Sequence, residues 1–464
     1  MNEPSWSDED DAALATSGVS LRRDTASRSA FAEDFGHVIR AEPWAVASPR
    51  SIDELASIIH FAANRRLPLC ARGRGYSQSG QSLLANGLSV DLSRLDRVGP
   101  IAPDRSQVEC EPGVRWRELT AAALRQGLVP QVLPLNLDMS VGGLLSAGGI
   151  GANSHRHGPV VNQVTELHVV TGTGHTVRCD GTRNADLFGA VLAGLGRCGM
   201  IARASVRLRP APARVRTFHL VYGEIEGWLA DQDRMVRDQR AQYLEAMCWM
   251  GAKGFRRGVS GDRSRAQWLY GIQVGFEYDR EAPDQLEALR ALSPWRVVHV
   301  DDESVSEFVN RYQPRFDGMH RSGAWQQSHP WFECLLAPDR LPALLPAILD
   351  DLPLSLGDGH RLLLVATGKR PPFFAAPEGE QAACFAALPT GIADGERGEI
   401  IPALARVDRL LREAGGKRYL SGWLGPMDEA RWREHIGEAY ERWLALKRRF
   451  DPATIFRSVL FPEG

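Results

Sequence analysis

The chain has 464 residues, 44% of them hydrophobic and 24% charged, and its formal net charge at pH 7 is −2. This length predicts two or three soluble globular domains, and the small net charge gives no basis for a nucleic-acid or membrane-surface partner. The seven cysteines are scattered and lack a C-x-x-C spacing, which is typical of reduced thiols in a cytoplasmic protein. We expect no metal site.

The N-terminal segment is acidic and rich in serine, and it contains no apolar core of a signal peptide. We expect residues 1–15 to form a flexible leader. No apolar run elsewhere in the sequence reaches the roughly 20 residues that span a bilayer, so we expect no membrane partner.

The first predicted folding unit is a strand, a helix and a second strand. Residues 44–47 are predicted as a short strand, and a capping box at Ser51 and Glu54 begins a helix that ends near Asn64. The apolar run from Leu67 to Ala71 is predicted to be a buried strand. It leads into a loop that is rich in glycine.

This glycine-rich loop, residues 72–81, is the predicted cradle of a pyrophosphate. Its glycines allow a positive φ and bring bare N–H groups close to a ligand, and successive N–H groups form a concave anion site. Two arginines add positive charge, and a serine and a glutamine add hydrogen-bonding groups. The residues that suggest this chemistry are Arg72, Gly73, Arg74, Gly75, Ser77, Gly80 and Gln81.

Two glycine patterns resemble a dinucleotide-binding fingerprint but have the wrong surroundings. The glycines at 73 and 75 follow a strand but lead to another strand pattern at 88–92, whereas the fingerprint needs a helix directly after them. The G-x-G-x-x-G run at 194–199 follows a predicted helix and precedes a predicted strand, which reverses the required order. We therefore exclude a Rossmann site.

The segment 131–151 follows a predicted helix at 116–126 and interleaves glycines with leucine, valine and isoleucine. We interpret it as too rich in glycine for a helix and too rich in small residues for an ordinary strand. Such a segment suits close approach of the backbone to a flat or phosphorylated ligand. A flexible linker is the alternative. Residues 164–170 and 175–179 are then predicted to form a hairpin.

The character of the sequence changes at about residue 213. Strands are predicted at 216–222, 243–245 and 269–276, a helix is predicted at 225–240, and six tryptophans lie between residues 228 and 331. Such a domain can supply an apolar pocket. The pattern changes again at 415–420, and a last amphipathic helix is predicted from Asp428 to Lys447.

Eight short pieces of sequence stand in a fixed order between about residues 40 and 456. They are 71–81, 141–150, 156–159, 186–188, 194–201, 329–331, 419–420 and 451–452. Together they resemble the flavoprotein family typified by vanillyl-alcohol oxidase and p-cresol methylhydroxylase, and within it the cytokinin dehydrogenases.

The resemblance implies an α+β fold with a two-part, PCMH-type FAD-binding domain. That domain is expected at 16–212 and again at 413–464, with a substrate-binding domain inserted at 213–412 and the flavin ring at their junction. The resemblance implies that the FAD phosphates lie at Ala71, Gly73, Arg74, Gly75, Ser77 and Gln81. Further FAD contacts are expected at Arg72, Tyr76, Ser140, Gly142, Gly143, Ser146, Gly149, Ile150, Gly199, Ile201 and Tyr419.

Several of these residues also have a structural interpretation. Ile150 and Ile201 suit a plain hydrophobic core equally well. Asp186 is expected to cap its helix rather than to bind the cofactor, and His329 is expected to be a structural turn residue.

The chain departs from the cytokinin dehydrogenases at the position of their flavin-linked histidine. Tyr76 stands there instead, and no cysteine lies within 131–158. We therefore predict that FAD is held without a covalent bond. The closing Ser-Pro-Gly-Gln run of that family is also replaced, by residues 457–460, so the contacts to the adenine end of FAD are expected to differ.

A second departure concerns the catalytic base, because the substrate-binding aspartate of those enzymes falls on Leu135. C–H oxidation by hydride transfer needs removal of the neighbouring N–H or O–H proton. Asp138 is a substitute if the loop is rebuilt, and it is equally suited to capping a turn. The candidate catalytic residues are Asp138, Tyr76, Glu245 and Tyr419, with His155 as a further possible base.

The sequence thus predicts an FAD-dependent oxidoreductase that acts on a carbon bearing nitrogen or oxygen in a small, apolar or aromatic substrate. Dioxygen or another acceptor would take the electrons, and the protein is expected to be a monomer or homodimer. The alternatives are a polyol or sugar oxidase of the same fold, and a flavoprotein that uses FAD as a scaffold for isomerisation or cyclisation without net redox.

Overall fold

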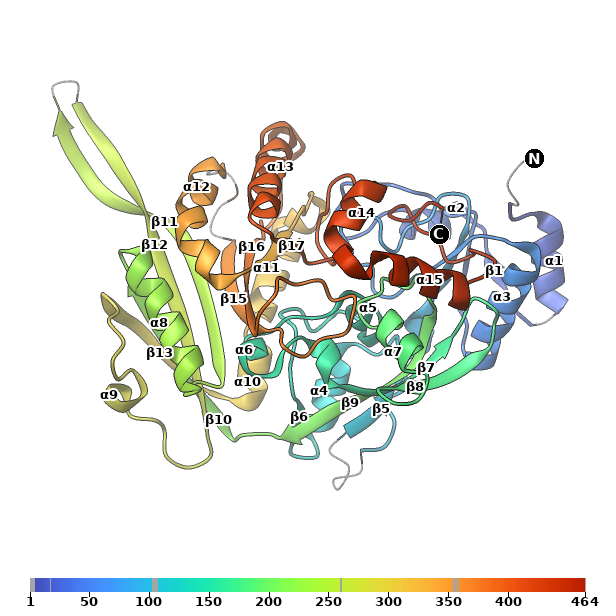
Figure 1. Ribbon diagram of the computed structural model, residues 1–464, viewed down its shortest axis with the longest axis horizontal. Coiled ribbons are helices and arrows are strands. Elements are labelled where there is room, and N and C mark those ends of the chain that lie inside the picture. The colour runs from blue at the N-terminus through green and yellow to red at the C-terminus, as the bar shows by residue number, and fades with distance from the viewer. Residues whose placement is uncertain are drawn as a thin grey trace.

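The computed structural model describes residues 5–16, 18–101, 107–258, 261–353, 356 and 359–463, with side chains for all of these except 252–258 and 261–267. The fold is α+β and is built on three sheets (Figure 1). Within the described ranges, no helix has both the length and the apolar character needed to cross a bilayer.

The N-terminal sheet holds the predicted strand–helix–strand unit. Its four strands are ordered β1-β2-β4-β3, and β2, β4 and β3 run parallel. The predicted capping residue Ser51 accepts a hydrogen bond from the backbone N–H of Glu54, at 3.1 Å. The elements are β1 (Leu21–Arg22), β2 (Ala45–Ala47), α3 (Ile52–Arg65), β3 (Leu69–Arg72) and β4 (Leu88–Asp91), with α2 (Thr25–Ala30) between β1 and β2.

Residues 5–16 differ from the predicted flexible leader, because they fold against this sheet. Helix α1 (Asp8–Thr16) follows Trp6, whose indole N–H donates to the carbonyl of Pro68 at 2.7 Å. The side chains of Trp6 and Leu14 are buried in the same core as α3. The prediction relied on the acidic composition of the segment, but its two buried apolar residues are enough to anchor it.

The second sheet has five antiparallel strands in the order β5-β9-β7-β8, with β6 also paired to β9. It contains the predicted hairpin of β7 and β8. The strands are β5 (Gln107–Cys110), β6 (Leu128–Pro130), β7 (Val164–Val170), β8 (Thr176–Asp180) and β9 (Met200–Pro210). The helices of this region are α4 (Trp116–Leu124), α5 (Val141–Ala147), α6 (Ser154–His157) and α7 (Ala185–Val191).

Helix α5 corrects the interpretation that the segment 131–151 is too rich in glycine for a helix. Ser140 caps it by accepting from the N–H of Gly143 at 3.3 Å. A Cβ on Gly142 would lie 2.6 Å from Cβ of Pro112. Close packing against Pro112 therefore requires glycine here, although glycine destabilises a helix. Burial of Val141, Leu144 and Leu145 offsets that cost.

The third sheet has eight strands in the order β13-β10-β12-β11-β15-β16-β14-β17, and all of its pairings are antiparallel. Helices α8, α12 and α13 contribute to its apolar core, and the β11–β12 hairpin projects from the body (Figure 1). The strands are β10 (Arg214–Tyr222), β11 (Tyr243–Gly258), β12 (Gly261–Tyr278), β13 (Arg296–Ser304), β14 (Phe332–Leu336), β15 (His360–Ala366), β16 (Gln381–Ala387) and β17 (Lys417–Arg418). The helices are α8 (Ile225–Asp238), α9 (Gln285–Ala288), α10 (Val305–Val309), α11 (Gln313–Ser322), α12 (Leu341–Asp351) and α13 (Arg397–Glu413).

The C-terminal segment returns from this sheet to the first two. The single helix predicted for 428–447 is two helices, α14 (Glu429–Ile436) and α15 (Tyr440–Phe450), because the chain turns at Gly437 with φ of +67°. Strand β17 still belongs to the eight-stranded sheet although it lies beyond residue 412. The predicted domain division near residues 212 and 412 stays a prediction.

A buried ion pair fixes the end of this returning segment. The Lys447 ammonium donates to Asp451 Oδ2 at 2.6 Å and to the carbonyl of Phe456 at 2.8 Å. The Asp451 carboxylate in turn accepts the N–H groups of Ile455 and Phe456. The N–H of Leu69 then bonds to the carbonyl of Ile455 at 2.8 Å. The C-terminus therefore supports the strand that carries the glycine-rich loop.

Candidate functional site

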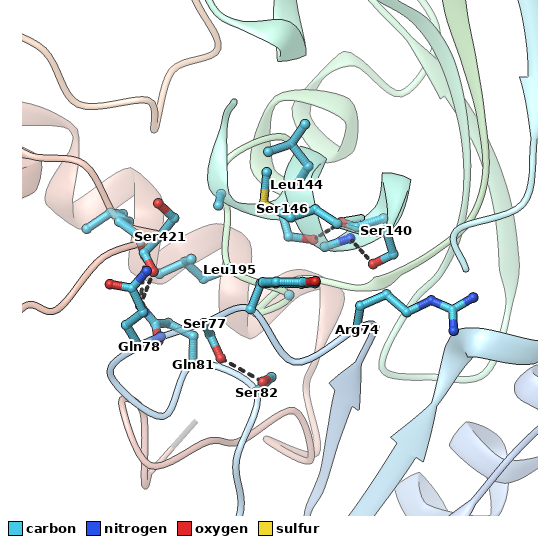
Figure 2. A pocket seen from close by; sticks show the side chains of 18 of the residues that line it. Arg74, Ser77, Gln78, Gln81, Ser82, Ser140, Leu144, Ser146, Leu195 and Ser421 are labelled. Carbon is cyan, nitrogen blue, oxygen red and sulfur yellow. Dashed lines mark hydrogen bonds between the residues drawn. The ribbon is translucent and has the colours of Figure 1, made fainter. Parts of the chain in front are cut away.

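A large cavity is lined by segments from all three sheets. It is lined by the glycine-rich loop after β3, by α5, by the start of β9 and by one face of strands β14, β15 and β16. Figure 2 shows the loop side chains of Arg74 and Ser77 in the same pocket as Ser140 and Ser146 from the α5 segment. Segments that lie far apart in the sequence thus form one site.

The predicted FAD positions gather at this cavity. Those that line it are Ala71, Gly73, Arg74, Gly75, Tyr76, Ser77, Gln81, Ser140, Gly142, Gly143, Ser146, Ile150, Gly199, Ile201 and Tyr419. The two exceptions are Arg72 and Gly149. Gly149 donates its N–H to the hydroxyl of Tyr419 at 2.7 Å.

The glycine-rich loop is shaped by contacts that exclude side chains. A Cβ on Gly73 would lie 2.1 Å from Oγ of Ser140, and Gly75 has φ of +74°. The loop therefore needs glycine at both positions, one for close approach and one for its left-handed backbone.

Arg72 and Asp34 hold this loop from behind. Arg72 extends away from the cavity and donates to the carbonyl of Glu33 at 2.7 Å. The structure thus gives Arg72 a supporting position rather than the expected phosphate contact. Asp34 accepts from the N–H of Gly80 at 2.9 Å and from the hydroxyl of Ser77 at 3.1 Å. Burial raises the pKa of Asp34 to about 6.

Gln81 joins the loop to the returning C-terminal segment. Its side-chain amide donates to the carbonyls of Leu420 at 2.9 Å and Gly422 at 3.1 Å. Its Oε1 accepts the N–H of Ser79 at 2.7 Å. Gln81 therefore positions residues on both sides of the cavity.

Tyr419 and Tyr76 are the two predicted catalytic residues that line the cavity. Burial raises the pKa of the Tyr419 phenol well above its ordinary value, so this side chain is a neutral hydroxyl. Burial also raises the pKa of Tyr76, whose hydroxyl interacts with the side chain of Asn136. The Tyr76 ring packs on Phe35 at 5.8 Å between centroids.

Asp138, the predicted substitute base, is engaged outside the cavity. Its carboxylate forms an ion pair with Arg117, at 2.9 Å from Nε, and it does not line the cavity. Arg117 also donates to Asn310 at 2.7 Å, which ties the loop to α10 and α11. This arrangement does not support the role of substitute base that Asp138 would have in a rebuilt loop.

Glu245 is buried beside the cavity and is not one of its lining residues. Its carboxylate accepts from Arg311 Nη2 at 2.9 Å and from the hydroxyl of Tyr312. Burial acts to raise the pKa of Glu245, but the guanidinium groups of Arg311 and Arg361 bring it below its ordinary value. Glu245 is therefore an ionised partner of arginines and is not a free base.

His155, a possible base, and Asp186, an expected helix cap, also lie away from the cavity. His155 is buried between the carbonyls of Ala152 and Ala241, and burial lowers its pKa to about 4. Asp186 is not a helix cap, since Asn184 occupies that position and Asp186 pairs with Arg442 at 2.8 Å.

The cavity contains a carboxyl group that the sequence analysis missed, Glu333 on β14. Its Oε2 accepts from the hydroxyl of Ser421 at 3.3 Å. Burial raises the pKa of Glu333 to about 7. A titrating group of this kind in a cleft is a candidate for proton transfer.

Arg361 on β15 is the second missed residue, and it shares a sheet face with Glu333. Both side chains are in register with Ala386 on the strand between them, and all three line the cavity. Each charged residue stands alone in an apolar strand, which is the sequence pattern that marks them. Which strands pair could not be read from that pattern.

The geometry fits an FAD group. Gly73, Gly142 and Gly143 line the cavity where the loop meets α5. A Cβ at each would meet protein atoms within 3 Å, so the two segments approach each other closely through glycine. Nε of Arg74, at the edge of this space, is buried and has no hydrogen-bond partner in the described part of the chain. A diphosphate would supply the missing acceptor.

Comparisons with known proteins agree with this fit. Residues 43–180 match the FAD-binding domain family. An uncharacterised oxidoreductase of the Rhodococcoides fascians fasciation locus is 29% identical over 91% of this chain and 94% of its own length. Cytokinin dehydrogenase 1 of Oryza sativa is 28% identical over 95% of this chain and 90% of its own. Cytokinin dehydrogenase 7 of the same species is 32% identical over 69% and 67%.

The FAD-binding domain and its cavity define an FAD-dependent oxidoreductase. The chain belongs to the cytokinin-dehydrogenase-like family of FAD-linked oxidases.

Proposed function

We propose that the protein oxidises a carbon bearing nitrogen or oxygen in a small, apolar or aromatic substrate held between the glycine-rich loop and the eight-stranded sheet. Bound FAD supplies the hydride acceptor, and dioxygen or another acceptor takes the electrons. The observation that carries this proposal is one cavity that is lined both by the predicted FAD positions and by Glu333, a carboxyl on β14.

Glu333 is the proposed base of this reaction. Its carboxylate form takes the proton from the substrate N–H or O–H as the neighbouring C–H bond breaks, which is the task assigned to such a base. Ser421 holds one oxygen of the carboxyl. The apolar side chains of Trp331, Leu363 and Leu388 line the same wall and limit the access of water.

We further propose that FAD is bound without a covalent link. Tyr76 occupies the position of the flavin-linked histidine of cytokinin dehydrogenases. Formation of a phenol linkage would require the phenolate, and burial raises the pKa of Tyr76, which disfavours that form. The phenol instead has Asn136 as its neighbour.

We propose a substrate other than cytokinin. Leu135 lines the cavity where the resemblance places the substrate-binding aspartate, and Asp138 is paired with Arg117. The proposed base of this protein is therefore on the sheet, at Glu333, and not in the loop at position 135. A substrate of different shape would present its acidic proton toward β14.

The same loss of a loop carboxylate favours one rival, a flavoprotein that uses FAD as a scaffold without net redox. Stopped-flow mixing of the oxidised protein with substrate separates the two. Loss of the visible flavin absorbance under anaerobic conditions supports oxidation, and turnover without any reduced flavin supports the scaffold.

Cofactor binding is tested on the purified protein. We expect a yellow protein with one FAD per chain that releases its flavin into the supernatant on acid precipitation. A colourless protein that does not take up added FAD would contradict the whole proposal. Colour that stays in the precipitate would contradict only the non-covalent link.

A further inference from the structure

A cluster of four polar side chains lies against the cavity wall at β15. It consists of Glu245, Arg311, Tyr312 and Arg361, and we call it the Arg361 cluster. The Glu245 carboxylate accepts from Arg311 Nη2 at 2.9 Å and from the Tyr312 hydroxyl. Arg361 Nη1 lies 3.5 Å from the same carboxylate and donates to the Tyr312 hydroxyl at 3.0 Å.

The Arg361 cluster carries one more positive than negative charge. Burial acts to lower the pKa of Arg361, but Tyr312 and Glu245 outweigh it, and the pKa rises above its ordinary value. The pKa of Arg311 is raised in the same way by Glu245. Burial raises the pKa of Tyr312, so that hydroxyl stays neutral. Within the cluster one carboxylate therefore faces two guanidinium groups. Outside it, the charge of Arg311 also acts to lower the pKa of Glu303.

The hydrogen bonds show that Arg361 is the guanidinium of the cluster with unused N–H donors. Both oxygens of Glu245 already have partners in Arg311 and Tyr312. In the described part of the chain, Arg361 donates only through Nη1. Its Nε–H and Nη2–H groups remain for another acceptor, and the side chain lines the cavity. A partly buried guanidinium with unused N–H donors is unfavourable unless a ligand provides acceptors for them.

The register of the sheet places this cation relative to the proposed base. Arg361, Ala386 and Glu333 are opposite one another on β15, β16 and β14, so their side chains share one face. Two strand spacings separate the charged residues by about 10 Å. Ala386 between them is small and leaves this part of the wall open.

We propose that the substrate carries a carboxylate, which the free N–H edge of Arg361 holds while the reacting carbon lies toward Glu333. A guanidinium presents paired donors that match a planar carboxylate. This inference rests on the proposed function, because it assigns a substrate class to the same cavity. An aromatic or short aliphatic acid fits both the charge and the apolar lining.

The test compares acids with amides of the same shape on the FAD-loaded protein. Benzoate and phenylacetate are titrated against benzamide and phenylacetamide, and binding is followed by the flavin difference spectrum. We expect the acids to bind about ten- to a hundredfold more tightly, as for a hydrogen-bonded charged group. Equal binding of acid and amide would overturn the proposal.

Variants then test whether Arg361 causes the preference for acids over amides. In Arg361→Gln the acids should lose at least about tenfold in affinity while the amides change little, and Arg361→Lys should keep part of the preference. Arg406→Gln is the matched control, because Arg406 pairs with Asp351 on the surface. An acid preference that survives in Arg361→Gln would overturn the proposal. So would a variant that shifts only the flavin reduction potential, since Arg361 would then serve the cofactor.

These outcomes are separate from failure of the proposed function. A protein that binds FAD but is reduced by no substrate contradicts the oxidase proposal, and its acid-to-amide ratio still reports on Arg361. If Arg361→Gln loses FAD or fails to fold, the wild-type comparison and Arg361→Lys decide the question.

Discussion

Replacement of Glu333 by glutamine is the most direct test of the proposed chemistry. Glutamine keeps the size of the side chain and a hydrogen-bond acceptor for Ser421, but it cannot take a proton. Loss of a positioned base typically slows the chemical step by about 100- to 10,000-fold. We therefore expect Glu333→Gln to bind FAD normally and to reduce it more slowly by a factor in that range.

The pH dependence follows from the pKa of about 7 that burial gives Glu333. The base must be ionised, so the rate of flavin reduction should rise with pH through 7. With that pKa, about 9% of the protein carries the carboxylate at pH 6 and about 91% at pH 8, a difference of about tenfold. Ser421 lowers this pKa by its hydrogen bond, so Ser421→Ala should move the midpoint to higher pH.

The assay is anaerobic stopped-flow reduction of the flavin at saturating substrate from pH 5.5 to 8.5. Asp138→Asn is the control, because Asp138 pairs with Arg117 away from the cavity. It should keep the wild-type profile. A pH-independent wild-type rate, or a Glu333→Gln variant that reduces its flavin at the full rate, would refute the assignment.

Three further changes probe the cofactor site and its support. Tyr76→His introduces the histidine that the resemblance to cytokinin dehydrogenases implies at this position, and part of the FAD should then stay with acid-precipitated protein. Gly73→Ala places a Cβ 2.1 Å from Oγ of Ser140, so the loop must shift and FAD content after gel filtration should fall at least about tenfold. Lys447→Met leaves the buried carboxylate of Asp451 unpaired and should lower the free energy of unfolding in urea by about 3–5 kcal/mol.

Each of these changes has a matched control. Tyr76→Phe should release its flavin as the wild type does. Gly398→Ala should leave FAD content unchanged, because an added Cβ there meets no atom within 4 Å. Arg449→Gln breaks an exposed ion pair and should cost less than about 1 kcal/mol. Equal losses of FAD in Gly398→Ala and Gly73→Ala would contradict the role given to Gly73. Equal losses of unfolding free energy in Lys447→Met and Arg449→Gln would contradict the role given to the buried ion pair.

Local patterns in the sequence were enough to predict much of the FAD-binding fold. The N-cap at Ser51, the glycine-rich loop and the 164–179 hairpin each depend on residues a few positions apart, and the structure contains all three. The predicted capping box is only half formed, because the Glu54 side chain accepts from the N–H of Arg50 at 2.8 Å and not from that of Ser51. Helix α5 was missed because its glycines are required by Pro112 and Ser140, which are contacts of tertiary structure. Propensity alone cannot anticipate them.

The catalytic candidates illustrate a different limit. Asp138 and Glu245 were selected because they are carboxylates near predicted site segments, yet each is paired with an arginine, Arg117 or Arg311, that lies 21 or 66 residues away in the chain. An isolated carboxylate and a paired one have the same letter in a sequence. Only the partner's position decides whether the group is available to a substrate.

Glu333 and Arg361 were overlooked for the opposite reason, since each lies inside an apolar strand rather than in a polar motif. A charge in a buried strand is costly unless it is paired or functional. Among the described residues, the Glu333 carboxyl has one side-chain hydrogen bond, from the Ser421 hydroxyl, and Arg361 retains unused donors. The strand register brings both onto one face of the sheet, across the small side chain of Ala386. On the proposed function, a change of substrate therefore needs only two positions of the eight-stranded sheet, Glu333 on β14 and Arg361 on β15.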